Sequence, residues 1–556
     1  MNILSALNRA KAIEQLSNTT YDLLVIGGGI TGAGIALDAA SRGLKVALIE
    51  KRDFASGTSS KSTKLIHGGL RYLKQLEVQL VREVGKERAT VHRLAPHLVK
   101  SEKMLLPLVK GGTYGGFATS IGLWVYDLLA GVTGDDKRRM LDKKKTQQKE
   151  PLLRDDILTG SGYYAEYRTD DARLTIENIK TAADYGAVSL NYIKAVDFNY
   201  EKGKIRSVQC EDILEGTTFT IDTQYVISAA GPWVDNLRKK DGSLSGKRLF
   251  LSKGVHIVVP HDRLPVKQSV YFDVSDGRML FAIPRQRVTY IGTTDTPYKG
   301  DINNIPVYLE DVDYLLEGVN AMFPEAKLTR EDVESSWAGL RPLIHEEGKS
   351  ASEMSRKDEI FEAESGLLSI AGGKLTGYRK MAERIVDRVV KRYESQSDVD
   401  LKDCFTQKIP LSGGPFAGAK EVEAYTKTVA DRLSTFELEQ RLANYLVHNY
   451  GKQTDAILDV LSRNSWSGPI GLIKAELLFG IEHELVIQPM DFLNRRSGRL
   501  YFDLPSILPA LDEVLSVFKQ YFGWSEQEVR AEKNKIEHIL HEHAHFVSES
   551  LAQTAS

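Results

Sequence analysis

The chain of 556 residues has few cysteines, almost no net charge and no long uninterrupted apolar run. Its two cysteines, Cys210 and Cys404, cannot build a disulfide framework, and neither belongs to a C-x-x-C motif, so we expect packing residues in a reducing cytosol. A net charge of −2 gives no general electrostatic attraction to nucleic acid. The composition therefore indicates a globular protein rather than a secreted disulfide scaffold or a nucleic-acid-binding protein.

The sequence also predicts no membrane span and no signal peptide. The most apolar long segment, residues 115–134, contains Asp127 and several glycine and hydroxyl residues, which interrupt it too often for a membrane span. The N-terminus lacks the apolar core of a signal peptide. It carries instead an apolar stripe at helical spacing, formed by Ile3, Leu4, Leu7, Ala10, Ile13 and Leu16. This stripe predicts a helix folded against the body of the protein, with a helix on a membrane surface as the alternative.

No solenoid repeat and no second G-x-G-x-x-G motif are present in the sequence. The lack of a second motif argues against enzymes that bind FAD and NADPH in two separate Rossmann units. A chain of this length is too long for one ordinary core, so we expect two or three domains.

Residues 21–50, YDLLVIGGGITGAGIALDAASRGLKVALIE, are predicted to form a strand, a glycine loop, a helix and a second strand. Gly27, Gly29 and Gly32 have the G-x-G-x-x-G spacing, which lets backbone N–H groups at the helix start bind a pyrophosphate. Glu50 ends the second strand, where a carboxylate can accept a hydrogen bond from a ribose and repels a 2′-phosphate. The unit therefore predicts FAD or NAD rather than NADP. The alternative is a parallel α/β unit whose glycines only pack.

The segment after Glu50, KRDFASGTSSKSTKLIHGGLRYL, is rich in glycine, serine and threonine. Hydroxyl groups and uncluttered backbone N–H groups suit the wrapping of phosphates or of a flavin edge. The alternative interpretation is a flexible surface loop. Arg71 and Tyr72 follow Gly68 and Gly69 at its end, so a guanidinium is expected near the cofactor.

The middle of the chain alternates between helical and strand patterns. Residues 76–108 have a helical pattern, and a basic stretch at 137–145 indicates either a solvated face or contact with an anionic membrane surface. An amphipathic helix within 167–186 precedes a buried strand at 188–192. A second buried strand, at 225–231, ends in Ala-Ala-Gly, as a parallel strand does when it abuts a bound dinucleotide.

Residues 250–345 change character. The runs HIVVP, SVYFDV, MLFAIP and VTYIGTTD are short and rich in β-branched and aromatic residues, which predicts an antiparallel sheet able to cover the cofactor. The nucleotide domain then resumes with a strand at 367–371 and the turn Gly372-Gly373-Lys374 before a helix. A helix N-terminus at this turn would stabilise the anionic edge of a flavin. A second glycine turn so late in the chain favours FAD over NAD.

Beyond about residue 398 the pattern is mostly helical. His538, His541, His543 and His545 have spacings that could hold a metal on a helix, but the end of a surface helix is the favoured interpretation and no metal site is predicted. The predicted fold is an α/β Rossmann-like FAD-binding domain, an antiparallel-sheet substrate domain and a C-terminal helical domain. The expected boundaries are 1–75, 160–250 and 345–395 for the first, 76–159 and 251–344 for the second, and 396–556 for the third.

Two separated motifs, IGGGITGAGIALDAASRG and GGKLTGYRKMA, together resemble the FAD-dependent, quinone-linked glycerol-3-phosphate dehydrogenases. HGGLRYL, AAGPWVD and the GLRPL around Arg341 fit the same pattern, and the resemblance covers most of residues 15–390. It implies oxidation of sn-glycerol 3-phosphate to dihydroxyacetone phosphate, with electrons passing to a membrane quinone. It also implies a cytoplasmic protein bound peripherally to the inner face of the cell membrane, often as a homodimer.

The substrate's chemistry selects the candidate site residues. A phosphate monoester needs fixed cations, and Arg71 and Arg341 are the first candidates. His256 is the expected base because its ordinary pKa lies near working pH, while the alternative is a hydrogen-bonded residue that opens a strand. The residues assigned to the substrate are Arg71, Tyr72, His256, Asp295, Arg341, Arg356 and Lys374, of which His256, Arg341 and Lys374 are assigned to catalysis.

The residues assigned to the cofactor come from the glycine turns, the Ser/Thr-rich segment and the strand ends: Gly27, Gly29, Ile30, Thr31, Gly32, Glu50, Lys51, Thr58, Ser59, Ser60, Ser62, Leu65, His67, Gly68, Gly69, Ala230, Gly231, Gly373, Lys374, Leu375 and Thr376. Two alternatives to a quinone-linked dehydrogenase remain open. One is an oxidase that passes electrons to oxygen and releases peroxide. The other is a flavoprotein that senses redox state without turnover.

Overall fold

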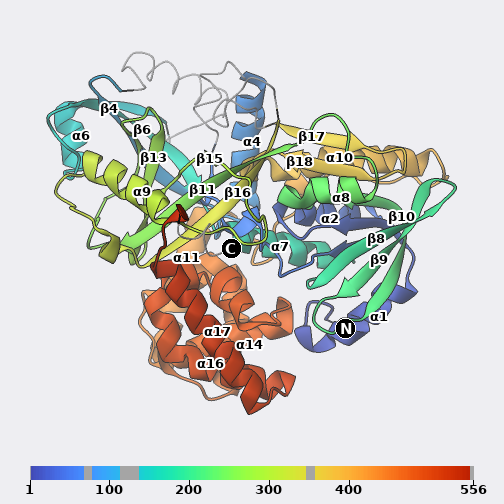
Figure 1. Ribbon diagram of the computed structural model, residues 1–556. Helices are drawn as coiled ribbons and strands as arrows, with labels where there is room; N and C mark the ends of the chain where they lie inside the picture. Colours follow the sequence, from blue (N-terminus) through green and yellow to red (C-terminus); the bar gives the residue numbers. More distant parts are fainter. Residues whose placement is uncertain (1, 68–77, 113–136, 346–356, 551–556) are drawn as a thin grey trace.

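The computed structural model describes residues 2–67, 78–112, 137–345 and 357–550. Two β-sheets stand side by side in the upper part of Figure 1, and helices of the C-terminal third form the layer beneath them. The predicted combination of a Rossmann-like domain, a sheet domain and a helical domain is confirmed.

The first sheet carries the nucleotide-binding pattern. Its strand order is β17-β18-β10-β1-β2-β7, and all neighbouring pairs are parallel except β17 with β18. The strands are β1 (Tyr21–Ile26), β2 (Val46–Ile49), β7 (Val188–Leu190), β10 (Thr218–Ser228), β17 (Asp358–Glu362) and β18 (Leu368–Gly372), with a hairpin of β8 (Ile193–Glu201) and β9 (Lys204–Asp212) joined to β10. The five buried strands expected from the sequence are therefore confirmed.

Three helices pack beside this sheet: α2 (Ile30–Arg42), α7 (Asp171–Asp184) and α10 (Tyr378–Glu394). α2 contacts both α7 and α10. Because β1 and β10 are neighbours, the glycine loop after Ile26 and the small residues after Ser228 meet at one edge of the sheet. This edge is the place where open α/β sheets bind their ligands.

The second sheet has the order β15-β11-β14-β13-β12-β4-β6-β3, with β16 paired to β11 and β5 paired to β6. Its strands are β3 (Leu65–Ile66), β4 (Lys100–Val109), β5 (Arg139–Asp142), β6 (Leu158–Arg168), β11 (Leu249–Pro260), β12 (Ser269–Asp273), β13 (Met279–Arg285), β14 (Val288–Gly292), β15 (Thr296–Pro297) and β16 (Ser335–Ile344). The sheet is antiparallel as expected, apart from the parallel pair β12 and β4.

One expectation about these segments is wrong. The helical pattern at 76–108 covers a helix, α4 (Val78–Leu94), followed by the strand β4. Pro96 prevents the helix from continuing, and pairing with β6 decides the conformation of the residues beyond it. β3 and β6 also lie in the second sheet, although their residues fall largely within segments expected in the FAD-binding domain. We therefore propose that the domain boundary lies after Arg168 rather than at residue 160.

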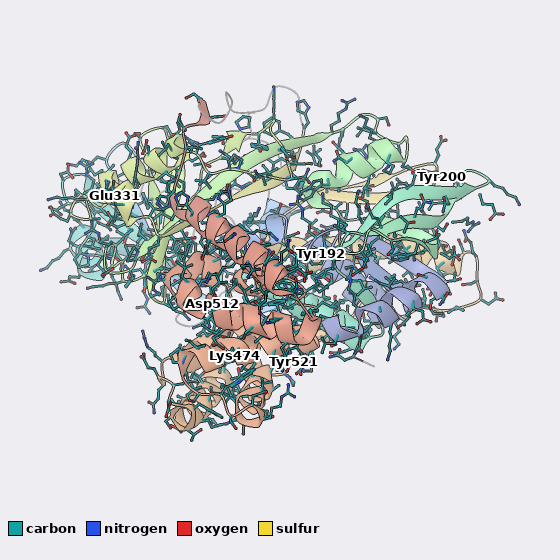
Figure 2. The ribbon with its side chains drawn as sticks, turned by 60° about the horizontal axis from the view of Figure 1, so that its bottom comes forward. Tyr192, Tyr200, Glu331, Lys474, Asp512 and Tyr521 are labelled. Carbon is teal, nitrogen blue, oxygen red and sulfur yellow. The ribbon has the colours of Figure 1, made fainter. Side chains whose placement is uncertain are left out.

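The expected helical domain is present and contains α11 (Ala419–Leu433), α12 (Leu442–Tyr450), α13 (Thr454–Arg463), α14 (Gly468–His483), α15 (Arg499–Phe502), α16 (Ile507–Phe522) and α17 (Glu526–Ala544). Figure 2 shows Lys474, Asp512 and Tyr521 on this layer, well apart from Tyr200 on β8. An apolar core joins α14, α16 and α17 to the second sheet, where Val258 and Tyr290 are buried. The helical domain therefore shares a core with the sheet domain.

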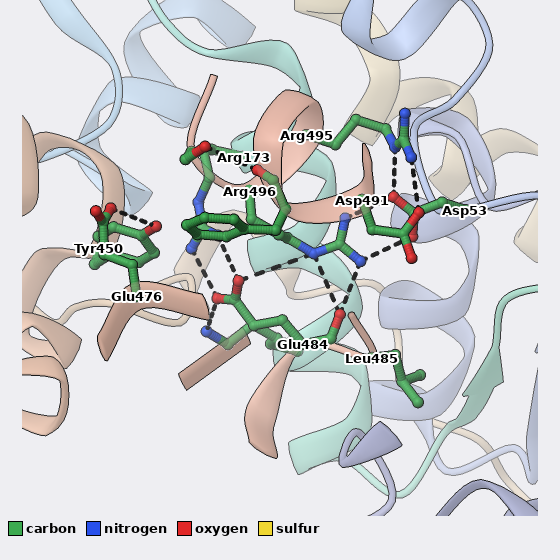
Figure 3. A network of polar contacts seen from close by, with 12 residues as sticks. Asp53, Arg173, Tyr450, Glu476, Glu484, Leu485, Asp491, Arg495 and Arg496 are labelled. Atoms are coloured by element: carbon green, nitrogen blue, oxygen red, sulfur yellow. Dashed lines mark hydrogen bonds and ion pairs between the residues drawn. The ribbon is translucent and has the colours of Figure 1, made fainter. Parts of the chain in front are cut away.

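Buried ion pairs also join the helical domain to the loop that follows β2 (Figure 3). An oxygen of Asp53 lies 2.7 Å from Nη1 of Arg496, and Asp53 also pairs with Arg495. Glu484 lies 2.7 Å from Nη1 of Arg173 on α7. Because an unpaired buried charge is strongly destabilising, these pairs hold the two domains in one arrangement.

The N-terminal segment forms a helix against the body of the protein, as predicted. In α1 (Arg9–Asn18), Ala12 and Leu16 are buried, and Arg9 lies 2.9 Å from Asp212 at the end of β9. None of the helices in the described part of the chain is long and apolar enough to cross a membrane. Residues 115–134, the most apolar segment, lie outside the described residues.

Candidate functional site

A cavity of about 430 Å³ is lined by residues from both sheets. The first sheet contributes the glycine loop after β1, the ends of β10 and β18, and Glu50 after β2. The second sheet contributes residues of β11 and β16. The Ser/Thr-rich segment between Lys51 and His67 lines the cavity between these two walls.

The glycine loop is shaped by close backbone contacts. Gly27 has φ +119°, and a Cβ at this position would lie 2.6 Å from the carbonyl oxygen of Ala229. A Cβ at Gly32 would lie 1.8 Å from the carbonyl oxygen of Gly27. Gly27 and Gly29 line the cavity, whereas Gly32 lies behind its wall and lets α2 approach the loop. The loop therefore leaves the start of α2 open to a ligand.

Glu50 fastens the loop at the end of β2. Its Oε2 accepts a hydrogen bond from the Gly28 N–H at 2.8 Å, and its Oε1 accepts one from the Arg52 N–H at 2.9 Å. Burial raises the pKa of the Glu50 carboxyl group. Each carboxylate oxygen can accept a second hydrogen bond, so Glu50 can hold the backbone and still bind a ribose hydroxyl.

Protein contacts hold the Ser/Thr-rich segment against the wall. Thr58 donates to the carbonyl oxygen of Leu340 at 2.7 Å, and Ser62 donates to the buried Asp171 at 2.6 Å. Ser59 Oγ accepts from the Ile30 N–H at the start of α2, at 2.9 Å. These contacts with β16, α7 and α2 contradict the alternative of a flexible surface loop.

The second glycine turn is fastened to the same segment. Lys374 donates from Nζ to the carbonyl oxygen of His67 at 3.0 Å, and Thr376 Oγ1 accepts from the His67 N–H at 3.1 Å. Gly373 has φ +77°, a conformation that favours glycine. The turn thus places Lys374 on the cavity wall directly before α10.

His256 lies on β11 and is only 1% exposed. Its ring stacks on Trp337 of β16, with centroids 4.7 Å apart, and its Nε2 lies 3.1 Å from Oγ1 of Thr63. Burial, with Arg341 and Lys64 nearby, holds the pKa of His256 well below its ordinary value. The imidazole is therefore neutral at neutral pH. Its Nδ1 is buried and has no hydrogen-bond partner within the described residues.

Arg341 is held on β16 by the segment that follows β14. Its Nη2 donates to Thr293 Oγ1 at 2.8 Å, and its Nη1 donates to the carbonyl oxygen of Thr294 at 3.1 Å and lies 3.3 Å from Asp295. The hydroxyl of Ser252 also contacts Asp295. Arg341 lines the cavity but Asp295 does not, so Asp295 acts here by orienting the guanidinium.

The structure brings most of the expected residues to one cavity. The predicted cofactor residues found on its wall are Gly27, Gly29, Ile30, Thr31, Glu50, Lys51, Thr58, Ser59, Ser62, Leu65, His67, Ala230, Gly231, Gly373, Lys374 and Leu375. Gly32, Ser60 and Thr376 are not on the wall. Gly68, Gly69, Arg71, Tyr72 and Arg356 lie outside the described residues.

Lys61 and Trp233 are among the cavity residues that were not predicted from the sequence. Lys61 lines the cavity, has no ion-pair partner in the described part of the chain, and has a pKa lowered to about 8, chiefly by burial. Trp233 also lines it, with Lys51 Nζ 4.0 Å from its ring and with Nε1 donating to Asn303 Oδ1 at 3.0 Å. Lys61 lies in the Ser/Thr-rich segment and Trp233 lies in the AAGPW motif, so the sequence could have indicated both. No motif marks Asn303.

These features fit a dinucleotide that carries no 2′-phosphate. The start of α2 can receive a pyrophosphate, Glu50 can bind a ribose, and a second glycine turn lines the same cavity. Residues 22–379 match the family model described as FAD dependent oxidoreductase, and the chain belongs to this family. Family membership confirms the expectation of FAD as the cofactor. Residues 404–529 match the C-terminal domain of alpha-glycerophosphate oxidase.

The chain is similar over nearly its whole length to named bacterial proteins. It is 50% identical to the aerobic glycerol-3-phosphate dehydrogenase of Bacillus subtilis (strain 168), covering 97% of this chain and 98% of that protein. It is 47% identical to the protein of the same name from Staphylococcus aureus (strain USA300), covering 98% of each.

Solved structures agree with this assignment. The glycerol-3-phosphate dehydrogenase from Bacillus halodurans complexed with FAD has a TM-score of 0.83 at 44% identity, covering 98% of this chain and 99% of that one. The L-alpha-glycerophosphate oxidase from Mycoplasma pneumoniae has a TM-score of 0.54 at 18% identity, covering 69% and 96%. The second likeness concerns the fold alone.

Proposed function

We propose that this protein oxidises sn-glycerol 3-phosphate at C2 to dihydroxyacetone phosphate, with FAD as its bound cofactor. The names of the relatives that match nearly the whole chain support this substrate. The observation that carries the proposal is the presence of the neutral imidazole of His256 and the guanidinium of Arg341 at one cavity. A phosphorylated secondary alcohol requires a base and a fixed cation, and the cavity supplies both.

FAD, when bound, supplies the hydride acceptor for C2 at its flavin N5. His256 removes the proton of the C2 hydroxyl group. The neutral ring has one nitrogen with a free lone pair that can accept this proton, and its Nε2 lies 3.1 Å from Thr63 Oγ1. The stacked Trp337 keeps the ring in one orientation.

The cations of the cavity bind the substrate's phosphate group. Arg341 presents a guanidinium whose position is set by Thr293, Thr294 and Asp295, and Lys374 is held by the His67 carbonyl oxygen. A guanidinium fixed in advance binds a phosphate with a smaller loss of side-chain entropy. From the sequence, we propose Arg71, Tyr72 and Arg356 as further substrate contacts.

For the cofactor, we propose that the start of α2 holds the pyrophosphate and that Glu50 binds the adenosine ribose. The Ser/Thr-rich segment and the turn at Gly373 hold the flavin half. The tight approach of Gly27 to Ala229 supports this assignment, because a side chain at residue 27 would fill the space beside the loop.

We propose a membrane quinone as the electron acceptor, and a cytoplasmic homodimer that binds peripherally to the inner face of the cell membrane. These parts of the proposal rest on the motif resemblance. The second candidate function is an oxidase that reduces oxygen to peroxide. It is favoured by one observation, namely that residues 404–529 match a domain described from an oxidase.

Anaerobic addition of sn-glycerol 3-phosphate to the flavin-loaded protein tests the proposal. We expect the flavin absorbance to bleach, and a protein that keeps its flavin without bleaching would contradict both enzyme functions and favour a redox sensor. Bleached protein is then divided between oxygen and a soluble quinone. Rapid recovery with quinone and slow recovery with oxygen supports the dehydrogenase, and the reverse order with peroxide release supports the oxidase.

A further inference from the structure

A second concave site lies outside the cavity, at the junction of β4, β6, the end of α6 (Lys143–Lys149) and the loop before β12. Its volume is about 670 Å³, within the range of ligand pockets. We name it the basic groove, because five cations line it: Lys100, Lys103, Lys149, Arg168 and Lys267. Its residues are not shared with the cofactor cavity.

The charges of the basic groove are poorly balanced. Glu102 is the acidic residue on its wall, and this carboxylate pairs with Arg168 at 2.5 Å and accepts from Ser269 at 2.8 Å. Lys100, Lys149 and Lys267 have no carboxylate partner within the described residues. Several uncompensated cations around one concavity create a positive potential that attracts an anion.

The neighbouring acid does not neutralise these lysines. Glu150 lies behind the wall, where its Oε2 accepts from the Lys267 N–H and from Gln268 Nε2, both at 2.8 Å. Burial raises the pKa of the Glu150 carboxyl group, and the described residues show no ion pair between Glu150 and a groove lysine. Burial and the nearby Arg168 lower the pKa of Lys100 to about 8, and this effect outweighs the opposing effect of Glu102 and Glu423.

The lysines at the start of α6 behave differently. Lys143 lies 3.0 Å from Asp155, and Lys145 lies 3.3 Å from Asp142. The basic stretch recognised in the sequence is thus partly balanced by carboxylates on a solvated face. The excess of positive charge is instead found in the groove, among lysines that come from separate parts of the chain.

We propose that the basic groove is a second anion-binding site, which takes a ligand carrying a phosphate group with two or more negative charges. Lysine ammonium groups bind phosphate as point charges. Gln148 on the same wall adds a side-chain amide for the remaining oxygens. The phosphate group can belong to a small soluble molecule or to a lipid headgroup, because the same lysines would bind it in either case.

The groove is also connected to the cofactor cavity. Arg168 pairs with Leu65 in the register of β6 and β3, and Leu65 lines the cavity. His67, two residues further on, holds Lys374. An anion bound at Arg168 of β6 would therefore lie beside β3, the strand whose Leu65 lines the cavity.

The test uses the full-length, flavin-loaded protein and the variant Lys100→Gln/Lys149→Gln/Lys267→Gln. The matched control is Lys143→Gln/Lys144→Gln/Lys145→Gln, which removes the same charge from the exposed face of α6. Binding of pyrophosphate is measured by calorimetry with glycerol 3-phosphate saturating the other cavity. Binding of vesicles of phosphatidic acid and phosphatidylcholine is measured by co-sedimentation.

We expect the groove variant to bind on the order of tenfold more weakly in at least one arm, and the control variant to change less than about twofold. Weakened pyrophosphate binding alone identifies a free phosphate ligand, and weakened vesicle binding alone identifies a lipid headgroup. Equal effects of the two variants, or no effect in either arm, would overturn the proposal. If the triple variant loses its flavin or unfolds, the double variant Lys149→Gln/Lys267→Gln replaces it in the same comparison. This double variant alters exposed lysines only.

Discussion

Gly292 and His256 face each other across β14 and β11 so closely that a Cβ atom at residue 292 would lie 2.2 Å from Cδ2 of the imidazole. Gly254 has the same relation to Arg341, since its Cβ would lie 2.3 Å from Nη2. Two glycines in neighbouring strands thus leave the space for the two proposed substrate groups. A glycine in a strand interior is destabilising, so its presence at these positions indicates a steric requirement.

We predict that Gly292→Ala lowers kcat by at least about tenfold, because the methyl group displaces the imidazole from its stacked position. Flavin content, measured by absorbance, should be unchanged. Gly377→Ala is the control, since Gly377 has φ −91° and nothing within 4 Å of an added Cβ. Equal rates for Gly292→Ala and the wild type would contradict the proposed role of His256.

The low pKa of His256 predicts the shape of the pH profile. A base must be neutral to accept a proton, so kcat/KM should rise with pH only below the ordinary histidine pKa of 6.5 and should be level from there to neutrality. His256→Gln should lower kcat by about 10²- to 10⁴-fold and abolish this acid limb. An acid limb that persists in the variant would assign the proton transfer to another group.

Removal of the Arg341 guanidinium should affect substrate binding more than flavin binding. We predict that Arg341→Ala raises the KM for glycerol 3-phosphate about 10- to 150-fold, the value of one or more charged hydrogen bonds. Asp295→Asn should give a smaller rise, because it loosens the guanidinium without removing it. Loss of flavin at an unchanged KM would show that Arg341 does not bind the phosphate.

The lowered pKa of Lys61 predicts a loss of substrate affinity at alkaline pH. Its pKa of about 8 means that the positive charge disappears as the pH rises through this value. The kcat/KM for glycerol 3-phosphate should therefore fall above about pH 8 in the wild type. Lys61→Arg should keep the charge and remove this fall, and Lys61→Met should be low at every pH. Identical profiles for all three proteins would exclude a role for Lys61.

The ion pairs of Asp53 should contribute to the free energy of unfolding without contacting the proposed catalytic residues. Asp53→Asn removes the buried carboxylate that Arg495 and Arg496 share and leaves each arginine with one acidic partner, Asp491 or Glu484, which should destabilise the protein by about 3–5 kcal/mol and lower its thermal midpoint. The two arginines hold the pKa of Asp53 at about 2, so this contribution is present above the ordinary pKa of 3.8 and is lost as the pH falls toward 2.

The exposed pair Glu439 and Arg441 provides the control for this effect. Glu439→Gln should leave the thermal midpoint unchanged, because an exposed ion pair is screened by water and salt. A midpoint for Asp53→Asn equal to that of Glu439→Gln would show that the network in Figure 3 does not hold the domains together.

The parts of the site that lie close together in the sequence were predictable. The glycine loop and Glu50 belong to a single strand–helix–strand unit, whose spacing is set by local geometry. Lys374 was predictable for the same local reason, because it lies in a glycine turn that leads into a helix. The strands of residues 250–345 were recognised because β-branched and aromatic residues cluster in short runs.

What the sequence by itself determined is thus the class of fold, the cofactor and the kinds of residue that meet it. The tertiary structure alone decided that β3 and β6 join the second sheet, that Asp295 stands behind Arg341, and that Lys61 faces the cavity. These relations arise from strand pairing between distant segments, as in the register of β11 with β16 that opposes His256 to Trp337. Such pairing depends on which faces can be buried together, and no local spacing encodes it.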